Sequence, residues 1–262
     1  MKFSIVIPAR NEAGNIGTTV NRICETLKRE GIDYEIVVVD DGSTDNTIEE
    51  VEACCAEDPG VRLVQNTGKH GFGRAVRCGL DAFTGDAVAI VMADSSDDPD
   101  NLVQYYHILS EKAECAFGSR FTRGSRVENY PGFKMVINRL VNLFIRILFG
   151  IRYNDVTNAF KAYRANVIQG CKPFISPHFN LTVEIPLKAI VRGYSYNVIP
   201  INWYGRKIGT TSLHLKEMGS RYLFIILYAW LEKMLTKGDY QKPVEEAFEP
   251  WSMEHKPSSV EK

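Results

Sequence analysis

The sequence predicts an α/β fold with a mostly parallel, Rossmann-like sheet flanked by helices. Short apolar runs alternate with helical patterns as far as residue 118. Three of these runs, which begin at Phe3, Val37 and Ala87, lead directly into polar and acidic residues. The composition is that of an ordinary globular chain, because 45% of its 262 residues are hydrophobic and 24% are charged.

The elements of the first part follow from apolar periodicity. We expect strands at residues 3–7, 35–39, 61–64, 87–92 and 115–118. Helices are expected at residues 16–27, from a cap at Ser43 or Thr44 to Ala56, at residues 75–83, and from Asp98 to Leu109. A regular alternation of strands and helices favours parallel strands with helices on both faces.

The pattern changes after Ser119. Residues 134–151 predict a very apolar helix whose polar residues form one narrow stripe. A polar segment with aromatics at 154–164, a helix at 181–191, a strand at 196–203 and a basic, glycine-containing loop at 206–213 follow. Residues 1–213 are thus expected to form one catalytic domain, residues 214–236 an amphipathic helix facing a membrane or a partner, and residues 237–262 a polar, disordered tail.

Composition excludes several classes of protein. The net charge of −1 argues against nucleic acid as a partner. The six cysteines show no metal-binding spacing, which is typical of reduced thiols in a cytosolic protein. The histidines form no ligand pattern, and no nucleophile motif of a hydrolase is present. The longest clean apolar run, residues 223–231, is shorter than the ~20 residues of a spanning helix.

Carboxylates at the ends of three strands predict an acidic cleft. The carboxyl ends of parallel strands meet at one edge of a sheet, where ligands bind. A cation is the usual reason to gather such charge. An aspartate at a strand end can instead cap the next helix, but three such ends together favour a binding site. The Gly71-x-Gly73 loop lacks the third glycine of a dinucleotide fingerprint.

The motifs at these strand ends resemble the family 2 glycosyltransferases of the GT-A fold. They are Ile7-Pro8-Ala9-Arg10-Asn11-Glu12, Val39-Asp40-Asp41-Gly42-Ser43-Thr44-Asp45 and Ala93-Asp94. Later segments resemble the dolichol-phosphate mannose synthase branch, which acts on polyprenyl phosphates: Gly71-Phe72-Gly73, Gly118-Ser119-Arg120-Phe121 and residues 155–164. The resemblance covers residues 2–213.

The resemblance implies roles for individual residues. It places the nucleotide-sugar at Pro8, Ala9, Asn11, Glu12, Asp40, Asp41, Gly71, Gly73 and Ala93. A divalent metal, Mg²⁺ or Mn²⁺, would bridge the donor diphosphate at the Asp-x-Asp motif. Here that motif reads Met92-Ala93-Asp94, so Asp94 is the surviving carboxylate, with Asn158 as a further metal-site candidate. Asp97 and Asp98 either compensate for Met92 or supply negative charge at a helix N-terminus.

The resemblance also assigns two catalytic arginines. Arg120 would lie near the acceptor phosphate, and Arg206 would belong to a basic loop that closes over the donor. Arg206 and Gly209 match the family pattern in that loop, whereas Thr211 and Ser212 replace a Ser-Lys pair. With Asp94 and the metal, these arginines would stabilise the departing diphosphate.

The sequence is therefore interpreted as that of an inverting hexosyltransferase. It would move a mannose- or glucose-type hexose from a GDP- or UDP-sugar to a dolichyl or undecaprenyl phosphate. One alternative is a family 2 enzyme acting on another glycan or glycolipid, with Asp97 or Asp98 as the base. The other is a catalytically weak paralogue that binds nucleotide-sugar.

A membrane surface is the expected location. Residues 134–151 and 220–236 combine apolar or aromatic faces with basic residues, which suits the headgroup region of a bilayer. We expect a cytoplasmic protein on the cytoplasmic face of a membrane. The alternative is that these helices pack on the sheet, in a homo-oligomer or against a membrane-spanning partner subunit.

Overall fold

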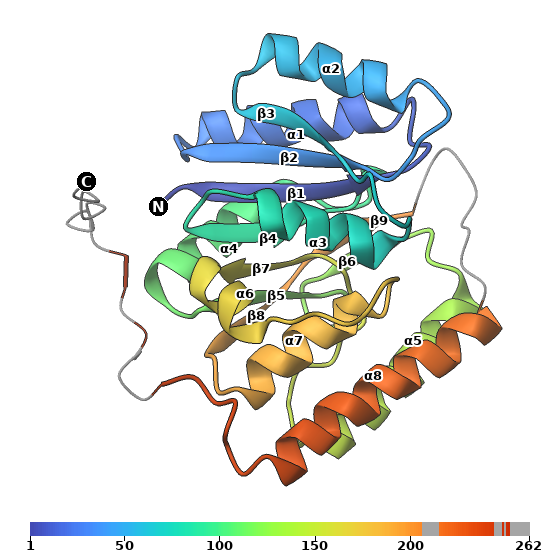
Figure 1. Ribbon diagram of the computed structural model, residues 1–262, viewed down its shortest axis with the longest axis vertical. Helices are drawn as coiled ribbons and strands as arrows, with labels where there is room; N and C mark the ends of the chain where they lie inside the picture. The colour runs from blue at the N-terminus through green and yellow to red at the C-terminus, as the bar shows by residue number, and fades with distance from the viewer. Residues whose placement is uncertain (206–214, 244–247, 249, 252–262) are drawn as a thin grey trace.

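A seven-stranded sheet forms the centre of the protein in the computed structural model, which describes residues 1–205, 215–243, 248, 250 and 251 (Figure 1). The strand order is β3-β2-β1-β4-β7-β5-β8. All neighbouring pairs are parallel except those of β7, which is antiparallel to both β4 and β5. The predicted α/β class and mostly parallel sheet are confirmed.

The first part of the chain follows the predicted alternation. Its elements are β1 (Phe3–Ala9), α1 (Ile16–Arg29), β2 (Tyr34–Asp40), α2 (Thr47–Glu57), β3 (Val61–Gln65), α3 (Phe72–Ala82), β4 (Ala87–Ile90), α4 (Asp100–Glu111) and β5 (Cys115–Ser119). Helix α2 begins later than expected because the Ser43 hydroxyl accepts the Asn11 N–H at 3.0 Å and so ties two loops together.

The second part departs more from the prediction. It contains β6 (Arg126–Glu128), α5 (Gly132–Phe149), β7 (Lys161–Arg164), α6 (Ala165–Cys171), α7 (Leu181–Val191), β8 (Tyr196–Pro200), β9 (Asn202–Tyr204) and α8 (Leu215–Leu235). The segment at 154–164, expected to be polar with aromatics and given no strand, ends in the buried strand β7. The single strand expected at 196–203 is two strands, because β8 pairs with β5 in the large sheet whereas β9 pairs with β6 in a separate two-stranded sheet.

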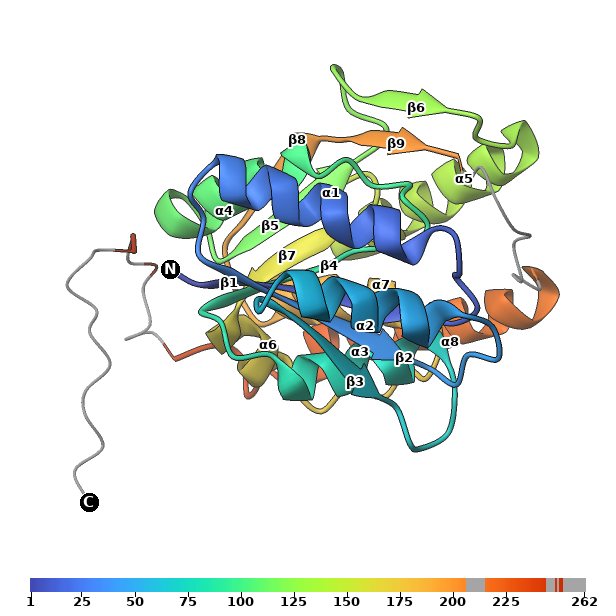
Figure 2. The same cartoon turned by 90° about the horizontal axis from the view of Figure 1, so that it is seen from above.

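Helices cover both faces of the sheet (Figure 2), and an apolar layer lies between the helices and each face. Alternate residues of β1 supply both: Ile5 and Ile7 pack with α1, α2 and α4, whereas Val6 packs with α3, α6 and α7. This division follows from the two-residue period of a strand, which points successive side chains to opposite faces. The carboxyl ends of β1, β2 and β4 therefore emerge together at one edge of a sheet buried on both sides.

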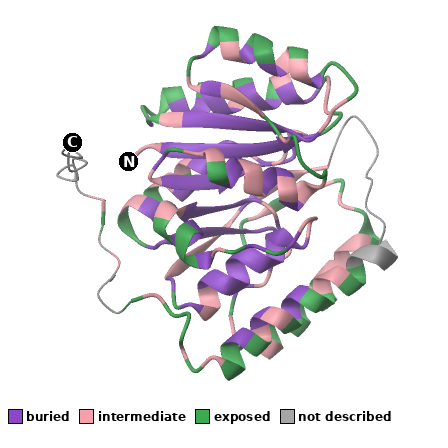
Figure 3. Ribbon diagram, in the orientation of Figure 1, coloured by how far each residue is buried: buried purple, intermediate pink, exposed green. Residues whose placement is uncertain are grey.

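Helices α5 and α8 lie next to each other at the edge of the molecule and contribute their inner faces to the core on the α7 side (Figures 1 and 3). Only one side of each helix is covered, by residues such as Ile145 and Ile225, which are fully buried. The other side exposes large apolar residues, which we call the α5/α8 apolar face: Phe133, Val136, Leu140, Leu143, Phe144, Ile147, Leu223, Phe224, Leu227, Leu231, Met234 and Leu235. No helix among the described residues has the length and apolar character needed to cross a membrane.

The expected tail lies partly outside the described residues. Of the part described, Lys242 donates its backbone N–H to the Arg192 carbonyl at 2.9 Å and forms an ion pair with Glu114 at 2.8 Å. Trp251 donates to the Ser110 carbonyl at 2.7 Å. These residues therefore contact the body of the protein at the amino ends of the strands, opposite the acidic edge.

Candidate active site

The loops after β1 and β2 are joined by side-chain hydrogen bonds. Asn11, at φ 54°, accepts the Thr44 N–H on its Oδ1 at 2.8 Å. The Glu12 N–H donates to the Thr47 hydroxyl at 2.9 Å. Pro8 and Ala9 are buried in β1 just before the loop. The structure thus brings together the residues expected to hold a nucleotide, and holds them in fixed loops.

Asp40 and Asp41 shape the neighbouring loops. Asp40 accepts the N–H groups of Gly42 and Ser43, at 3.0 and 3.2 Å, and so closes the turn after β2. Asp41 accepts the Asn66 side chain at 2.6 Å and the Gly71 N–H at 2.7 Å. Both carboxylates are almost fully buried. Because each carboxylate oxygen can accept more than one hydrogen bond, these contacts leave acceptor capacity for a ligand.

Gly71 and Gly73 are required by close packing between loops. A side chain at Gly71, whose φ is +146°, would lie 2.6 Å from the Pro177 carbonyl oxygen. At Gly73 it would lie 2.5 Å from the Ser176 carbonyl oxygen. The glycine loop therefore contacts the turn before α7, and the structure gives both glycines a packing role. Their contact with a nucleotide stays a prediction.

The loop after β4 carries the remaining acids. Asp94 is half-buried and accepts the Ser96 N–H at 3.2 Å, while the preceding Ala93 carbonyl accepts the Thr19 hydroxyl at 3.0 Å. Asp97 is buried and accepts the Met92 N–H at 3.0 Å. Burial, with a further contribution from the charge of Asp94, raises the pKa of Asp97 to about 7.

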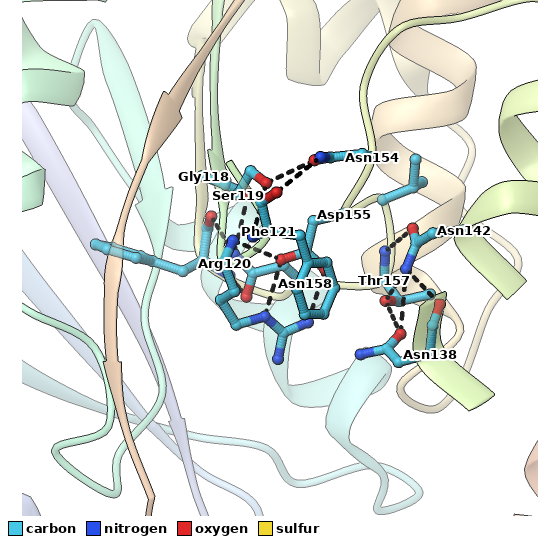
Figure 4. A network of polar contacts seen from close by, with 12 residues as sticks. Gly118, Ser119, Arg120, Phe121, Asn138, Asn142, Asn154, Asp155, Thr157 and Asn158 are labelled. Carbon is cyan, nitrogen blue, oxygen red and sulfur yellow. Dashed lines mark hydrogen bonds and ion pairs between the residues drawn. The ribbon is translucent and has the colours of Figure 1, made fainter. Parts of the chain in front are cut away.

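Arg120 is held at the end of β5 by a buried ion pair (Figure 4). Its Nε and Nη2 donate to the two oxygens of Asp155, each at 2.8 Å, and its backbone N–H donates to the same carboxylate at 2.9 Å. Burial lowers the pKa of Arg120, but the charge and hydrogen bonds of Asp155 outweigh it and raise this pKa above its ordinary range. The guanidinium also lies against the rings of Phe121 and Tyr130.

A second polar cluster adjoins this ion pair and connects it to α5 (Figure 4). Thr157 donates its hydroxyl to Asn138 Oδ1 and accepts the Asn142 amide at 3.0 Å. The Asn138 amide donates to the Tyr130 hydroxyl at 2.8 Å. Sequence reasoning gave no role to this cluster or to Asp155. It placed Asp155 and Thr157 in the family-like segment 155–164, and Asn138 and Asn142 in the polar stripe of the helix expected at 134–151.

Lys161 fixes the loop that carries Asp155. Its ammonium is buried and donates to the carbonyls of Val156, Asn158 and Thr182. The Asn158 amide donates to the Gly118 carbonyl at 3.3 Å, and its oxygen accepts the Phe160 N–H at 3.4 Å. Both ends of Asn158 are therefore bonded within the protein, and its role at a metal stays a prediction. Arg206 lies outside the described residues.

The residues at this edge of the sheet are suited to hold a divalent cation whose remaining ligands come from a bound phosphorylated molecule and water. No three His, Cys, Asp or Glu side chains come together in the described part of the chain. Mg²⁺, however, is usually held by one or two carboxylates, with phosphate oxygens and water completing its shell. Asp94 provides such a carboxylate at the edge where β1, β2 and β4 end.

A Rossmann-like sheet with carboxylates at one edge and a fixed arginine beside them is typical of proteins that bind nucleotides and phosphorylated groups. Comparison with known families identifies the class further. Residues 4–171 match the model of glycosyl transferase family 2. The chain belongs to this family and is a glycosyltransferase, as its sequence motifs predict.

Individual relatives indicate which branch of the family the chain resembles. The chain is 29% identical over 215 residues to a polyprenol monophosphomannose synthase of Mycolicibacterium smegmatis, covering 80% of each protein. It is 32% identical over 191 residues to a dolichol-phosphate mannosyltransferase of Pyrococcus furiosus, covering 72% of this chain and 53% of the relative. An undecaprenyl-phosphate mannosyltransferase of Micrococcus luteus is 27% identical over 219 residues, covering 81% of this chain and 88% of the relative. The predicted branch of the family is thus confirmed.

Solved structures confirm the fold. Glucosyl-3-phosphoglycerate synthase from Mycobacterium tuberculosis, in complex with UDP, superposes with a TM-score of 0.65 at 19% identity, over 88% of this chain and 79% of that one. The same enzyme has been crystallised with Mn²⁺ and UDP. The shared architecture is the GT-A arrangement of a mostly parallel sheet between helices.

Proposed function

We propose that this enzyme transfers a hexose, of the mannose or glucose type, from a nucleoside-diphosphate sugar to a polyprenyl phosphate. The observation that carries the proposal is the position of Arg120. It lies at the end of β5, in the same sheet as the acidic strand ends, and it touches α5 through Phe121, over which Arg139 also lies at 5.4 Å. The arginine thus stands between the acidic edge and the α5/α8 apolar face.

The acceptor would be a lipid phosphate. Two of the three guanidinium nitrogens of Arg120 are engaged by Asp155, and no described residue bonds its Nη1. Because arginine is always charged and its nitrogens are held in plane, a fixed guanidinium recognises phosphate well. The apolar tail attached to such a phosphate would lie in the bilayer that the α5/α8 apolar face contacts.

The reaction would be a single displacement at the anomeric carbon with inversion. An ionised phosphate oxygen is already nucleophilic, so the enzyme needs no strong general base. Catalysis then depends on holding donor and acceptor in line and on stabilising the charge of the departing diphosphate. A divalent cation at Asp94 supplies charge stabilisation when bound. Asp155 contributes by keeping Arg120 in one orientation.

A transfer assay tests the proposal. Purified protein is incubated with GDP-mannose, GDP-glucose, UDP-glucose or UDP-galactose and with dolichyl or undecaprenyl phosphate in vesicles, and products are identified by mass. We expect one donor to give a hexosyl-phospholipid, and the configuration at its anomeric carbon to be opposite to that of the donor. The proposal would be contradicted if the enzyme transferred hexose only to acceptors of other kinds: a glycan, phosphoglycerate, or a glycolipid that carries no phosphate.

The α5/α8 apolar face is proposed to bind the membrane surface. Its 12 large apolar residues are exposed, and helix α5 carries Lys134, Arg139 and Arg146 but no acid. Basic residues near a surface of anionic lipid contribute about 1 kcal/mol each to binding. Flotation with vesicles of anionic lipid at low salt tests this: protein that remains in the soluble fraction would exclude direct binding and favour a protein partner.

A further inference from the structure

Two neighbouring aspartates in the loop after β4 have different structural roles. Asp98 supports the start of helix α4: its Oδ1 accepts the N–H of Asp100, the first residue of the helix, at 3.2 Å, and its Oδ2 accepts the Asn202 side chain at 2.9 Å. Asp97 makes neither of these contacts. Its backbone instead pairs with Trp203 in an isolated β-bridge. The two hydrogen bonds of Asp98 therefore account for this residue and leave Asp97 to be explained.

Asp97 is a buried carboxylate with unused bonding capacity. Its side chain accepts the Met92 N–H on Oδ2, and in the described part of the chain no group bonds its Oδ1. The residue is only 5% exposed. A buried carboxylate without a compensating charge is unfavourable, so such groups are usually paired or bound to a metal.

Among the described residues, Asp97 forms no ion pair. Two charged groups act on this carboxylate: Asp94 raises its pKa and Arg120 lowers it. Arg120 is already neutralised by Asp155, to which it donates two side-chain hydrogen bonds. Asp94 and Asp97 thus repel each other. A cation bound between them would offset both this repulsion and the cost of burying the charge of Asp97.

We propose that Asp97 joins Asp94 in holding the divalent cation of the donor diphosphate, in place of the aspartate that is absent at position 92. The hydrogen bond from the Met92 N–H holds the Asp97 carboxylate against the same backbone position. Two carboxylates, diphosphate oxygens and water form an ordinary shell for Mg²⁺ or Mn²⁺. This inference rests on the proposed function, because it takes a nucleoside diphosphate as the second ligand.

Binding of Mn²⁺ to the full chain tests the inference without any turnover. Free Mn²⁺ is measured by electron paramagnetic resonance, with GDP and separately with UDP present. Asp97→Asn should weaken Mn²⁺ binding by at least about tenfold, the order of loss found when metal-site residues are changed. Asparagine keeps an oxygen for the Met92 N–H, so the loop should hold its shape.

Asp98→Asn is the matched control, because it makes the same change at the next residue. It should bind Mn²⁺ within about threefold of wild type, since the carboxylate that it loses is bonded to the Asp100 N–H and the Asn202 side chain. Met92→Asp added to Asp97→Asn should recover most of the lost affinity. Wild-type affinity in Asp97→Asn, or equal losses in Asp97→Asn and Asp98→Asn, would overturn the inference.

Two further measurements distinguish the loss of a metal ligand from misfolding and from failure of the proposed function. Circular dichroism confirms that each variant is folded; should Asp97→Asn fail to fold, Asp97→Ser, which also retains an oxygen near Met92, carries the same test. Hexosyl transfer by wild type is measured separately. If wild type transfers hexose and Asp97→Asn keeps its Mn²⁺ affinity, the role of Asp97 is rejected and the proposed function stands. If wild type shows no transfer and Asp97→Asn loses Mn²⁺ affinity tenfold, the proposed function is rejected and the role of Asp97 stands.

Discussion

At the scale of single residues, the first prediction concerns Asp94. This half-buried carboxylate is proposed to hold the cation of the donor diphosphate. Asp94→Asn keeps the shape of the side chain and removes its charge. We expect turnover to fall below about a tenth of wild type, which corresponds to roughly 1.4 kcal/mol in the barrier. Steady-state rates measure the loss, and an unchanged melting temperature shows that the fold is intact. Turnover above that level would mean that Asp94 is not a principal metal ligand.

Arg120 supports a second prediction at this scale. Arg120→Lys keeps the charge but cannot donate two hydrogen bonds to Asp155 and also face a phosphate. We expect kcat/KM for the polyprenyl phosphate to fall by about 10² or more. The affinity for donor nucleotide, measured by calorimetry, should stay within about threefold because the arginine is proposed to contact the acceptor. A larger loss of nucleotide affinity than of acceptor use would place Arg120 at the donor instead.

The residues of the candidate site differ in how far sequence could predict them. Asp94 and Arg120 follow strands β4 and β5, and strong apolar runs make such ends visible. The different roles of Asp97 and Asp98 were not visible, because two adjacent aspartates before a helix give one signal. Asp155 begins a family-like segment, but its role was not visible: its partner lies 35 residues away along the chain, and only the fold brings the two together.

At the scale of elements, the turn between α2 and β3 is held by one carboxylate. Asp58 accepts the Tyr34 hydroxyl at 2.5 Å and the Gly60 N–H at 2.8 Å, and forms an ion pair with Lys28 at 2.8 Å. Burial raises the pKa of Asp58, but these partners outweigh it and lower this pKa to about 2.

The low pKa of Asp58 makes its contribution to stability depend on pH. Because the folded state holds this proton more weakly than the unfolded state, the contribution is present above about pH 4 and is lost as pH falls through about 2. Asp58→Asn should therefore lower the free energy of unfolding at pH 7 by about 2 kcal/mol. The difference from wild type, measured by urea denaturation, should shrink at pH 2. A difference that does not change with pH would show that the charge is not responsible.

Helices α5 and α8 allow a test of the α5/α8 apolar face. Leu140 and Ile147 are 60% and 74% exposed, so replacing both by Glu should leave the core intact. We expect the double variant to lose flotation with anionic vesicles and still bind donor nucleotide, because charge at an apolar membrane-binding face opposes insertion. Thr18→Glu with Gln104→Glu, at exposed positions of α1 and α4, adds the same charge and should float like wild type.

Most elements were predictable because their apolar periodicity is strong. Strand β7 was not, because it reads Lys161-Ala162-Tyr163-Arg164 and lacks a run of branched apolar residues. It is stable there because both neighbours bond its backbone, and because Lys161 finds three carbonyls inside the protein. Tertiary contacts of this kind override local propensity and leave no local trace in the sequence.

At the scale of the whole molecule, the site and the α5/α8 apolar face should act together on a membrane-bound acceptor. Raising salt from about 50 to 500 mM screens the attraction between basic residues and anionic lipid. We expect transfer to acceptor in anionic vesicles to fall several-fold, and transfer to a water-soluble short-chain polyprenyl phosphate to change little. Equal falls for both acceptors would place the salt effect in the active site.

The position of β7 also has a consequence for how the protein is made. The sheet joins β4 to β5 only through β7, which lies about seventy residues after β4 in the chain. At a synthesis rate of about 5–20 residues per second, one edge of β4 would have no partner strand for several seconds, until β7 has been made. Until then an open strand edge is available to other chains. We therefore expect nascent chains arrested before Lys161 to bind chaperones, and longer ones, which include this strand, to be released.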